Sequence, residues 1–369
     1  MTKFQLKKVN SADIKQELEL IGFDNTYLTQ ATNKYKYINI KLFMLTLPQA
    51  NILKQTALSV GADCAVHRDI LTAKVETTDC ILGGSYSQIK KIAQKISNQP
   101  FSMSKLSNEL ENFLNSEKEK TLPKIVGILN LTKDSFSDGG QYYEFESAIK
   151  HLNKMIDDGA DIIDIGAEST KPNFTPISDE EQLRELVPVL EYINKTNIST
   201  PISIDTRSSV VAKHALDLGA KIINDISGFE HDKNMPKIIA ESGAKIILQN
   251  TNFGSSIDNV FFDLKNKLKL ALDSGIEKDN IILDVGIGFG KTKEQNFELI
   301  KRIDEFQSIG CKLMLGISRK SLLDMPHATN EEKDIFTVAL NTLAIEKNVD
   351  YLRVHNVKLH KELIKLMEQ

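Results

Sequence analysis

The sequence predicts an α/β fold: a (β/α)8 TIM barrel over residues 121–369, preceded by a small α/β domain over residues 1–120. One observation is the length, because 369 residues are about enough for a small domain plus a barrel of roughly 250 residues. The other is a repeated pattern of short apolar runs, rich in β-branched residues, with amphipathic helical stretches between most neighbours. The eight runs are residues 125–130, 161–167, 201–206, 221–227, 245–250, 280–286, 312–318 and 351–356.

Each run is predicted to be a strand of a closed barrel. Continuous apolar runs are typical of parallel strands that are covered on both faces, and eight units in about 250 residues favour a barrel over an open sheet. The clearest unit is the buried run 281–284, followed by glycines and a predicted helix over 293–306. No GxGxxG dinucleotide fingerprint follows the first strand.

The N-terminal segment has a different texture. Helix-like patches cover 11–21 and 86–97, and a strand-like run covers 79–83, among many Lys, Asn and Ser residues. The polar residues 115–121 precede Pro123 and indicate a solvated linker or helix end. We therefore expect the domain boundary there, and a structural or interaction role for residues 1–120.

Composition excludes several classes of protein. Lys and Arg total 46 against 50 Asp and Glu, which is not the basic excess that nucleic-acid binding requires. Cys64, Cys80 and Cys311 are far apart and form no CxxC pair, so we interpret them as reduced core residues. The N-terminus lacks a signal-like apolar region, and no apolar stretch is long enough to cross a bilayer. A cytoplasmic protein without membrane or nucleic-acid partners is expected.

Polar residues end almost every predicted strand, and the C-terminal ends of barrel strands face the active site. The set comprises Asn130, Glu168, Ser169, Thr170, Asp205, Asn224, Asp225, Gln249, Asn250, Asp284, Ser318, Arg319, Lys320, Arg353 and His355. Asp205, Asn224 and Asp284 end apolar strands, where a buried carboxylate is costly unless it meets N–H donors. A planar heterocycle with amide-like and guanidine-like groups supplies such donors.

A second group suits a metal-bound phosphate. Asn130 offers a neutral oxygen ligand, and Arg353 and His355 offer donors from alternate positions of one strand, so both point the same way. The alternative is that Asp205 and Asp284 cap the following helices and that Arg353 forms a structural ion pair. One shared site explains the whole rim better than independent caps do.

A glycine-rich segment follows the sixth strand. Residues 286–292 (GIGFGKT) resemble a nucleotide P-loop, but the GxxxxGK[ST] spacing requires glycine where Val285 stands, so ATP binding is not expected. The glycines allow the backbone to approach a ligand beside Phe289. The Phe289 ring either stacks on an aromatic substrate or packs within the loop.

Further motifs lie along the predicted barrel, namely GILNLTKDSFSDGG (127–140), DIGAESTKP (164–172), SIDT (203–206), INDI (223–226), DVGIGFGK (284–291), SRKS (318–321) and LRVH (352–355). Together these motifs resemble the dihydropteroate synthases over essentially all of residues 123–369. The resemblance implies an enzyme of folate biosynthesis that condenses 6-hydroxymethyl-7,8-dihydropterin pyrophosphate with p-aminobenzoate. It also implies a homodimer built through helices late in the barrel, and competition by sulfonamides.

The resemblance also implies roles for individual residues. Asp205, Asn224, Asp284 and Lys320 would hold the pterin, and Thr170, Pro172, Phe289 and Ser321 would line the p-aminobenzoate site. Asn130, Arg353 and His355 would hold pyrophosphate and Mg²⁺, with Asn130 the metal ligand. The catalytic group would be Asn130, Lys320, Arg353 and His355.

Four residues, at three places in the chain, depart from the family pattern. Gln249 and Asn250 stand where a Met-His pair is frequent, Val285 stands where proline is frequent, and Lys171 stands where arginine is usual. Lysine does not replace the bidentate fork of arginine. Two other functions stay open: a pterin-binding barrel that passes a methyl group to a corrinoid protein, and a pterin-binding protein with reduced catalytic activity.

Overall fold

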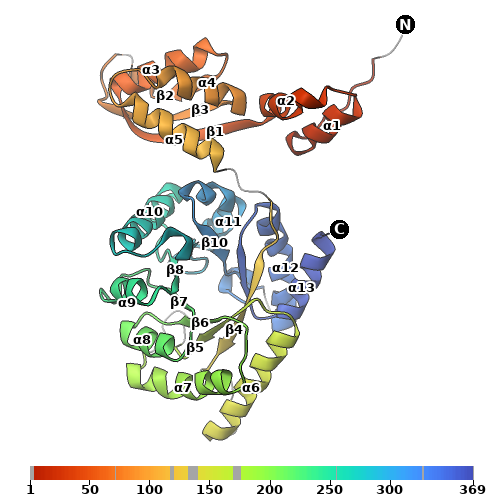
Figure 1. Cartoon of the computed structure of the whole chain (residues 1–369), viewed down its shortest axis with the longest axis vertical. Coiled ribbons are helices and arrows are strands. Elements are labelled where there is room, and N and C mark those ends of the chain that lie inside the picture. Colours follow the sequence, from red (N-terminus) through yellow and green to blue (C-terminus); the bar gives the residue numbers. More distant parts are fainter. Residues whose placement is uncertain are drawn as a thin grey trace. The chain divides into compact units, whose positions relative to one another are not determined.

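The computed structural model describes residues 4–70, 72–116, 120–131, 140–168, 176–254, 256–325 and 328–368. The chain forms two compact units, residues 1–118 and residues 119–369 (Figure 1). The predicted boundary, between residues 120 and 121, lies two residues further along the chain. Each unit has a hydrophobic core of its own.

The C-terminal unit is the predicted barrel. Its eight strands close in chain order, each parallel to the next, and the last strand pairs with the first. The prediction of eight strands is confirmed. The strands are β4 Lys124–Asn130, β5 Ile162–Gly166, β6 Ile202–Asp205, β7 Ile222–Asp225, β8 Lys245–Gln249, β9 Ile281–Asp284, β10 Lys312–Leu315 and β11 Tyr351–Val354.

Helices surround the barrel (Figure 1) and pack on it through one large apolar core. They are α6 Gly140–Asp157, α7 Asp179–Lys195, α8 Ser209–Asp217, α9 Met235–Ser242, α10 Ile257–Asp273, α11 Lys293–Lys301, α12 Asn330–Glu346 and α13 Val357–Met367. The predicted helix over 293–306 is wrong in its second half, where a 3₁₀ helix, Ile303–Ile309, follows α11. Because a 3₁₀ helix repeats every three residues, Ile303, Phe306 and Ile309 all face the core.

The interior of the barrel changes from apolar to polar toward its mouth. An apolar layer at the N-terminal side is formed by Val126, Ile162, Ile222, Ile247, Ile282, Met314 and Tyr351. Side chains alternate along a strand, so the residue two positions later points inward as well. Those residues are Ile128, Asp164, Asn224, Gln249, Asp284, Gly316 and Arg353. The sequence alternation thus places most of the polar strand ends inside the mouth.

The N-terminal unit contains a three-stranded antiparallel sheet in the order β1-β3-β2, packed with helices. Its elements are α1 Ile14–Leu20, α2 Leu28–Tyr35, β1 Tyr37–Thr46, α3 Leu47–Ser59, β2 Asp63–Val66, β3 Thr77–Ser85, α4 Tyr86–Ile96 and α5 Met103–Asn115. The predicted helices over 11–21 and 86–97 and the strand over 79–83 fall on α1, α4 and β3. β1, β2, α2, α3 and α5 were not predicted.

Two expectations about the whole chain concern cysteines and membranes. Cys64 and Cys80 are buried, Cys311 is partly buried, and all three are free thiols. Among the residues the structure describes, no helix has the length and apolar character that crossing a bilayer requires.

Candidate active site at the barrel mouth

Arg353 lies between two carboxylates inside the barrel mouth. Its Nε donates to Asp164 Oδ2 at 2.6 Å, and its Nη2 donates to Asp205 Oδ2 at 2.8 Å. Asn224 Nδ2 donates to the same oxygen of Asp164 at 3.0 Å. Four strands, β5, β6, β7 and β11, therefore contribute to one buried polar cluster.

The charges of this cluster are unequal, because two carboxylates share one guanidinium. Burial raises the pKa of Asp205 to about 7. Arg353 acts to lower this pKa, whereas the neighbouring carboxylate of Asp164 acts to raise it. Burial lowers the pKa of Arg353, but Asp164 and Asp205 outweigh that effect and the pKa is raised. Arg353 stays charged, and the pocket has surplus acceptor capacity.

Two acceptors in the cluster have no partner among the described residues. They are Asp164 Oδ1 and Asn224 Oδ1, and the side chains of both residues are almost completely buried. A buried acceptor without a hydrogen bond costs about 1–3 kcal/mol. These oxygens are therefore suited to a ligand that brings N–H donors into the mouth.

Asp284, Lys320 and Phe289 form the neighbouring part of the mouth. Asp284 Oδ1 accepts from Gly286 N at 2.7 Å, and burial raises the pKa of Asp284 while Lys320 lowers it. Lys320 Nζ donates to Ile287 O at 2.5 Å and lies 4.6 Å from the centre of the Phe289 ring. The ring is only half-buried, so one part of it faces the open mouth.

The loop after β9 needs glycine at its first turn. Gly286 has a φ of +69°, and a Cβ there would lie 1.7 Å from Asn250 O. Lys291 Nζ holds the same loop by donating to Gly286 O at 2.9 Å and to Phe289 O at 3.0 Å. The glycine-rich segment is thus a tightly held turn that presents Phe289.

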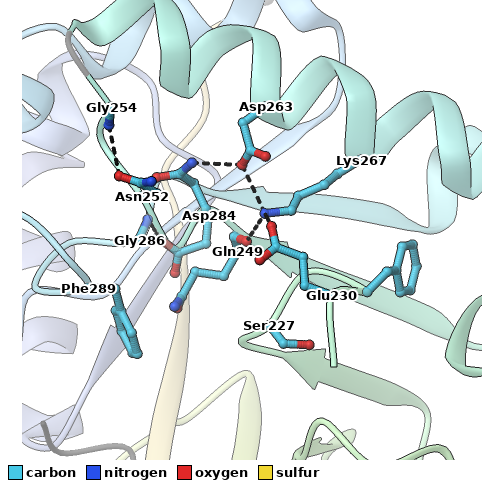
Figure 2. A network of polar contacts seen from close by, with 12 residues as sticks. Ser227, Glu230, Gln249, Asn252, Gly254, Asp263, Lys267, Asp284, Gly286 and Phe289 are labelled. Carbon is cyan, nitrogen blue, oxygen red and sulfur yellow. Dashed lines mark hydrogen bonds and ion pairs between the residues drawn. The ribbon is translucent and has the colours of Figure 1, made fainter. Parts of the chain in front are cut away.

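The unusual pair Gln249 and Asn250 belongs to a polar network with Asp263 and Lys267 of α10, and Figure 2 shows Gln249, Asp263 and Lys267 close together. Lys267 of α10 donates to Gln249 O at 3.1 Å and forms ion pairs with Asp263 at 2.9 Å and Glu230 at 3.0 Å. Asn250 Nδ2 donates to Asp263 Oδ2 at 2.7 Å. The network ties the end of β8 to α10 and to the loop after β7.

His355 lies beside the Arg353 cluster and is neutral. Its Nδ1 is 2.9 Å from Ser318 Oγ, and its backbone N–H donates to the same oxygen at 3.2 Å. Burial lowers the pKa of His355 to about 3, and the cations Arg319 and Arg353 lower it further. Near neutral pH, His355 therefore acts as a neutral hydrogen-bonding group rather than as a cation.

Asn130 and Ser321 lie at the edge of the mouth. Asn130 ends β4 and pairs with Gly166, which in turn pairs with Asp205, and its side chain is partly exposed. Ser321 begins a 3₁₀ helix, Ser321–Leu323, and is exposed. Thr170, Lys171 and Pro172 lie outside the described residues.

The helix-capping alternative is wrong for both aspartates. Ser208 caps α8 by accepting from Val211 N, and Thr292 caps α11 by accepting from Gln295 N. Asp205 binds Arg353 instead, and Asp284 caps a turn. The ion-pair alternative is correct for Arg353, although both of its partners line the site.

Sequence reasoning missed Asp164 as a site residue, because it lies inside a strand and not at its end. Its signal was a carboxylate in the middle of the apolar run 161–167, two positions after the inward-facing Ile162. Arg353, assigned to the pyrophosphate, directly contacts Asp205, assigned to the pterin, so the two groups of residues meet inside one mouth.

A magnesium site built from protein ligands alone is not found in the part of the chain that the structure describes, because no three His, Cys, Asp or Glu side chains gather there. Mg²⁺ commonly binds one or two protein oxygens, water and substrate phosphates. Asn130, partly exposed at the rim, fits that mode as a single neutral oxygen ligand.

The closed barrel with a buried acid-amide-arginine cluster at its mouth defines a barrel enzyme for a flat, nitrogen-rich substrate. Residues 126–355 match the family described as pterin binding enzyme. The chain belongs to this family. Relatives that are 41% and 37% identical place it, within the family, among the dihydropteroate synthases.

Similarity to individual proteins supports this assignment. The chain is 41% identical to the dihydropteroate synthase of Clostridium beijerinckii over 250 residues, which cover 66% of this chain and 93% of that protein. A solved structure of the Clostridium difficile enzyme, determined with pteroic acid, has a TM-score of 0.64 and 37% identity and covers 68% of this chain and 97% of that one.

A longer relative extends the match beyond the barrel. A probable bifunctional folylpolyglutamate synthase/dihydropteroate synthase of Haloferax volcanii is 32% identical over 343 residues, covering 84% of this chain and 40% of that protein. Because residues 119–369 make up about two thirds of the chain, this match includes part of the N-terminal unit. The N-terminal unit thus has a counterpart in at least one relative.

Proposed function

We propose that the barrel joins 6-hydroxymethyl-7,8-dihydropterin pyrophosphate to p-aminobenzoate, giving 7,8-dihydropteroate and pyrophosphate in folate biosynthesis. The observation that carries the proposal is the Asp164–Arg353–Asp205 cluster with its unpartnered buried acceptors. It offers acceptors to a donor-rich heterocycle and, beside them, a permanent cation. The relatives named above support the same reaction.

The pterin ring would bind against the acidic and amide side chains. Asp205, Asn224 and Asp284 would accept from its N–H groups, and Asp164 Oδ1 offers a further acceptor at the same depth. Lys320 would contact the ring from the Asp284 side. Burial without water makes each of these hydrogen bonds strong, provided that the ligand satisfies the acceptors.

The pyrophosphate would leave toward Arg353, His355 and Asn130. Arg353 supplies positive charge, neutral His355 supplies a hydrogen bond, and Asn130 would hold Mg²⁺ together with substrate oxygens. When bound, the ion would neutralise charge that develops on the leaving group. These residues and Lys320 are the proposed catalytic group.

The p-aminobenzoate would bind at the outer rim. Phe289 and Ser321 are exposed enough to contact it, and Thr170 and Pro172, which follow β5 in the sequence, are proposed to complete the site. Sulfonamides, which share its shape, would compete there.

In this reaction the protein mainly positions the two substrates and stabilises the charge that develops on them. The bond between the pterin methylene carbon and the pyrophosphate oxygen breaks largely before the arylamine nitrogen bonds to that carbon, and the arylamine then loses a proton. The electron-rich pterin stabilises the cationic methylene, while Arg353 and His355 stabilise the departing oxygen.

The decisive assay measures pyrophosphate release with dihydropterin pyrophosphate, Mg²⁺ and p-aminobenzoate. We expect turnover with the full chain and with residues 121–369, since the barrel has its own core. Pterin binding without pyrophosphate release would indicate the catalytically reduced alternative. Methyl transfer to a corrinoid protein would indicate the methyltransferase alternative.

The charge of Lys320 predicts a pH dependence. Burial lowers its pKa to about 8, although Asp284 raises it, so the ammonium loses its proton as the pH rises past that value. The KM for the pyrophosphate substrate should therefore rise above about pH 8. In Lys320→Met this step should be absent and the KM high throughout. A step that persists in Lys320→Met would belong to another group, such as Lys291, whose pKa burial lowers to about 7.

We further propose a homodimer through the late helix α12. Its outer face carries an apolar stripe of Ile335, Ala339 and Leu343 at four-residue spacing, with Ile335 60% and Leu343 47% exposed. Light scattering of the full chain measures its mass and so distinguishes a dimer from a monomer.

The N-terminal unit is proposed to have a structural or interaction role. The three free thiols accord with the proposed cytoplasmic location.

A further inference from the structure

Arg319 adopts a backbone conformation that is unusual for its residue type. Its φ is +57°, in the left-handed region, which is strained for a residue with a side chain unless its surroundings hold it there. The neighbours Ser318 and Lys320 contact His355 and Ile287 at the mouth, whereas Arg319 reaches helix α12. The left-handed conformation of Arg319 therefore allows residues 318–320 to contact both the mouth of the barrel and helix α12.

Asp334 of α12 is the partner that holds Arg319. Arg319 Nε donates to Asp334 Oδ1 and Arg319 Nη2 donates to Asp334 Oδ2, both at 2.9 Å. The Asp334 side chain is almost completely buried. A bidentate pair with a buried carboxylate is among the stronger and geometrically more exacting contacts in proteins.

The same carboxylate also holds the loop after β11. Asp334 Oδ2 accepts from Asn356 Nδ2 at 3.2 Å, and Asn356 directly follows His355. Asn356 Oδ1 accepts from Leu359 N at 3.1 Å and so caps α13. Asp334 therefore connects the loop that carries Lys320 with the loop that carries His355.

The two loops are connected a second time at the mouth, through Ser318 and His355. One connection lies at the site and the other, through Asp334, lies behind it. With both in place, a change in the separation between Lys320 and His355 would break hydrogen bonds of one or both connections. Without Asp334, the rear connection is lost and the left-handed conformation of Arg319 loses its support.

We propose that Asp334 is a positioning residue that does not touch substrate but sets the affinity of the site for the pyrophosphate end of the pterin substrate. The inference rests on the proposed function, which places His355 at the pyrophosphate and Lys320 at the pterin ring. Without Asp334, Lys320 keeps its hydrogen bond to Ile287 O, so the main effect is expected at the pyrophosphate. Groups that orient metal ligands from behind commonly affect affinity or activity by about 10–100-fold, and we expect an effect at the lower end of that range here.

The test compares Asp334→Asn with Glu331→Gln, which changes an exposed acid in the first turn of the same helix. In Asp334→Asn we expect the KM for the pterin pyrophosphate and the dissociation constant of inorganic pyrophosphate with Mg²⁺ to rise about tenfold. Binding of a pterin that lacks phosphate should change less than about threefold. Glu331→Gln should match the wild type in all three.

A double-mutant cycle with Arg319→Lys tests the path of the effect. Lysine keeps the charge but loses the fork, so it should raise the same two constants, and the double variant should be little worse than either single variant. If Asp334→Asn does not fold, Asn356→Ser removes the hydrogen bond to Asp334, while the serine hydroxyl can still cap α13. This variant should weaken pyrophosphate binding in a folded barrel.

Two results would overturn the inference. One is unchanged pyrophosphate binding in a folded Asp334 or Asn356 variant. The other is equal weakening of pyrophosphate and phosphate-free pterin, which would indicate a purely structural role. A wild-type protein that binds neither ligand would instead overturn the proposed function itself.

Discussion

Replacing Arg353 with alanine is expected to lower kcat/KM by on the order of a hundredfold, or about 3 kcal/mol of transition-state stabilisation, as for the loss of an oxyanion donor. The variant removes the permanent cation at the leaving group. It also leaves Asp164 and Asp205 buried without their guanidinium partner. Breaking such a buried pair commonly costs about 3–5 kcal/mol of folding stability, so thermal unfolding must be measured beside pyrophosphate release.

The matched control is Arg302→Ala. Arg302 also binds two carboxylates, Glu298 and Glu305, but on the surface at the end of α11. Turnover should stay close to that of the wild type. Arg353→Lys should recover part of the stability but little of the rate, because lysine cannot contact both carboxylates as a fork. Unchanged turnover in a folded Arg353→Ala protein would contradict the role of Arg353.

Replacing Asp205 with asparagine should weaken pterin binding by roughly 2–5 kcal/mol, the usual loss when one side of a buried charged pair is removed. The variant also removes the carboxylate that Arg353 Nη2 contacts. Calorimetric titration of a pterin measures the effect. Because the pKa of Asp205 is raised to about 7 by burial, wild-type affinity should fall as the pH drops below 7, when the acceptor gains a proton. That pH dependence should be smaller in Asp205→Asn.

Asp161→Asn is the control for this experiment. Asp161 stands just before β5 at the opposite end of the barrel, where its Oδ2 accepts from Ile125 N and Lys361 Nζ, each at 2.7 Å. Its loss should lower stability and leave pterin affinity unchanged. An Asp205→Asn protein with wild-type pterin affinity would remove Asp205 from the pocket.

The barrel was predictable because each β/α unit can be recognised from a short stretch of sequence. A buried parallel strand is a short apolar run, and a polar residue at its C-terminal end reaches the mouth whichever neighbours the strand has. Asp284 illustrates this, since the run 281–284 already indicates both the strand and the exit of its carboxylate into the mouth.

The N-terminal unit was harder to predict because its first strand departs from simple alternation. The register between β1 and β3 shifts between Leu42 and Leu45, and Met44 has a φ of +55°. A bulge of this kind breaks the period of two on which strand prediction depends. β1 therefore could not be recognised from its residues.

By itself, the sequence determined the eightfold α/β repeat, the family and the list of polar groups at the mouth, since all three depend on short motifs. Only the tertiary structure decided which of those groups touch. Arg353 meets Asp164 and Asp205 across 189 and 148 residues because closure of the barrel sets β11 beside β4. His355 is neutral because packing between distant segments buries it. Asp334 binds residues of two loops, Arg319 and Asn356, because the same packing brings those loops to α12. No local pattern encodes them.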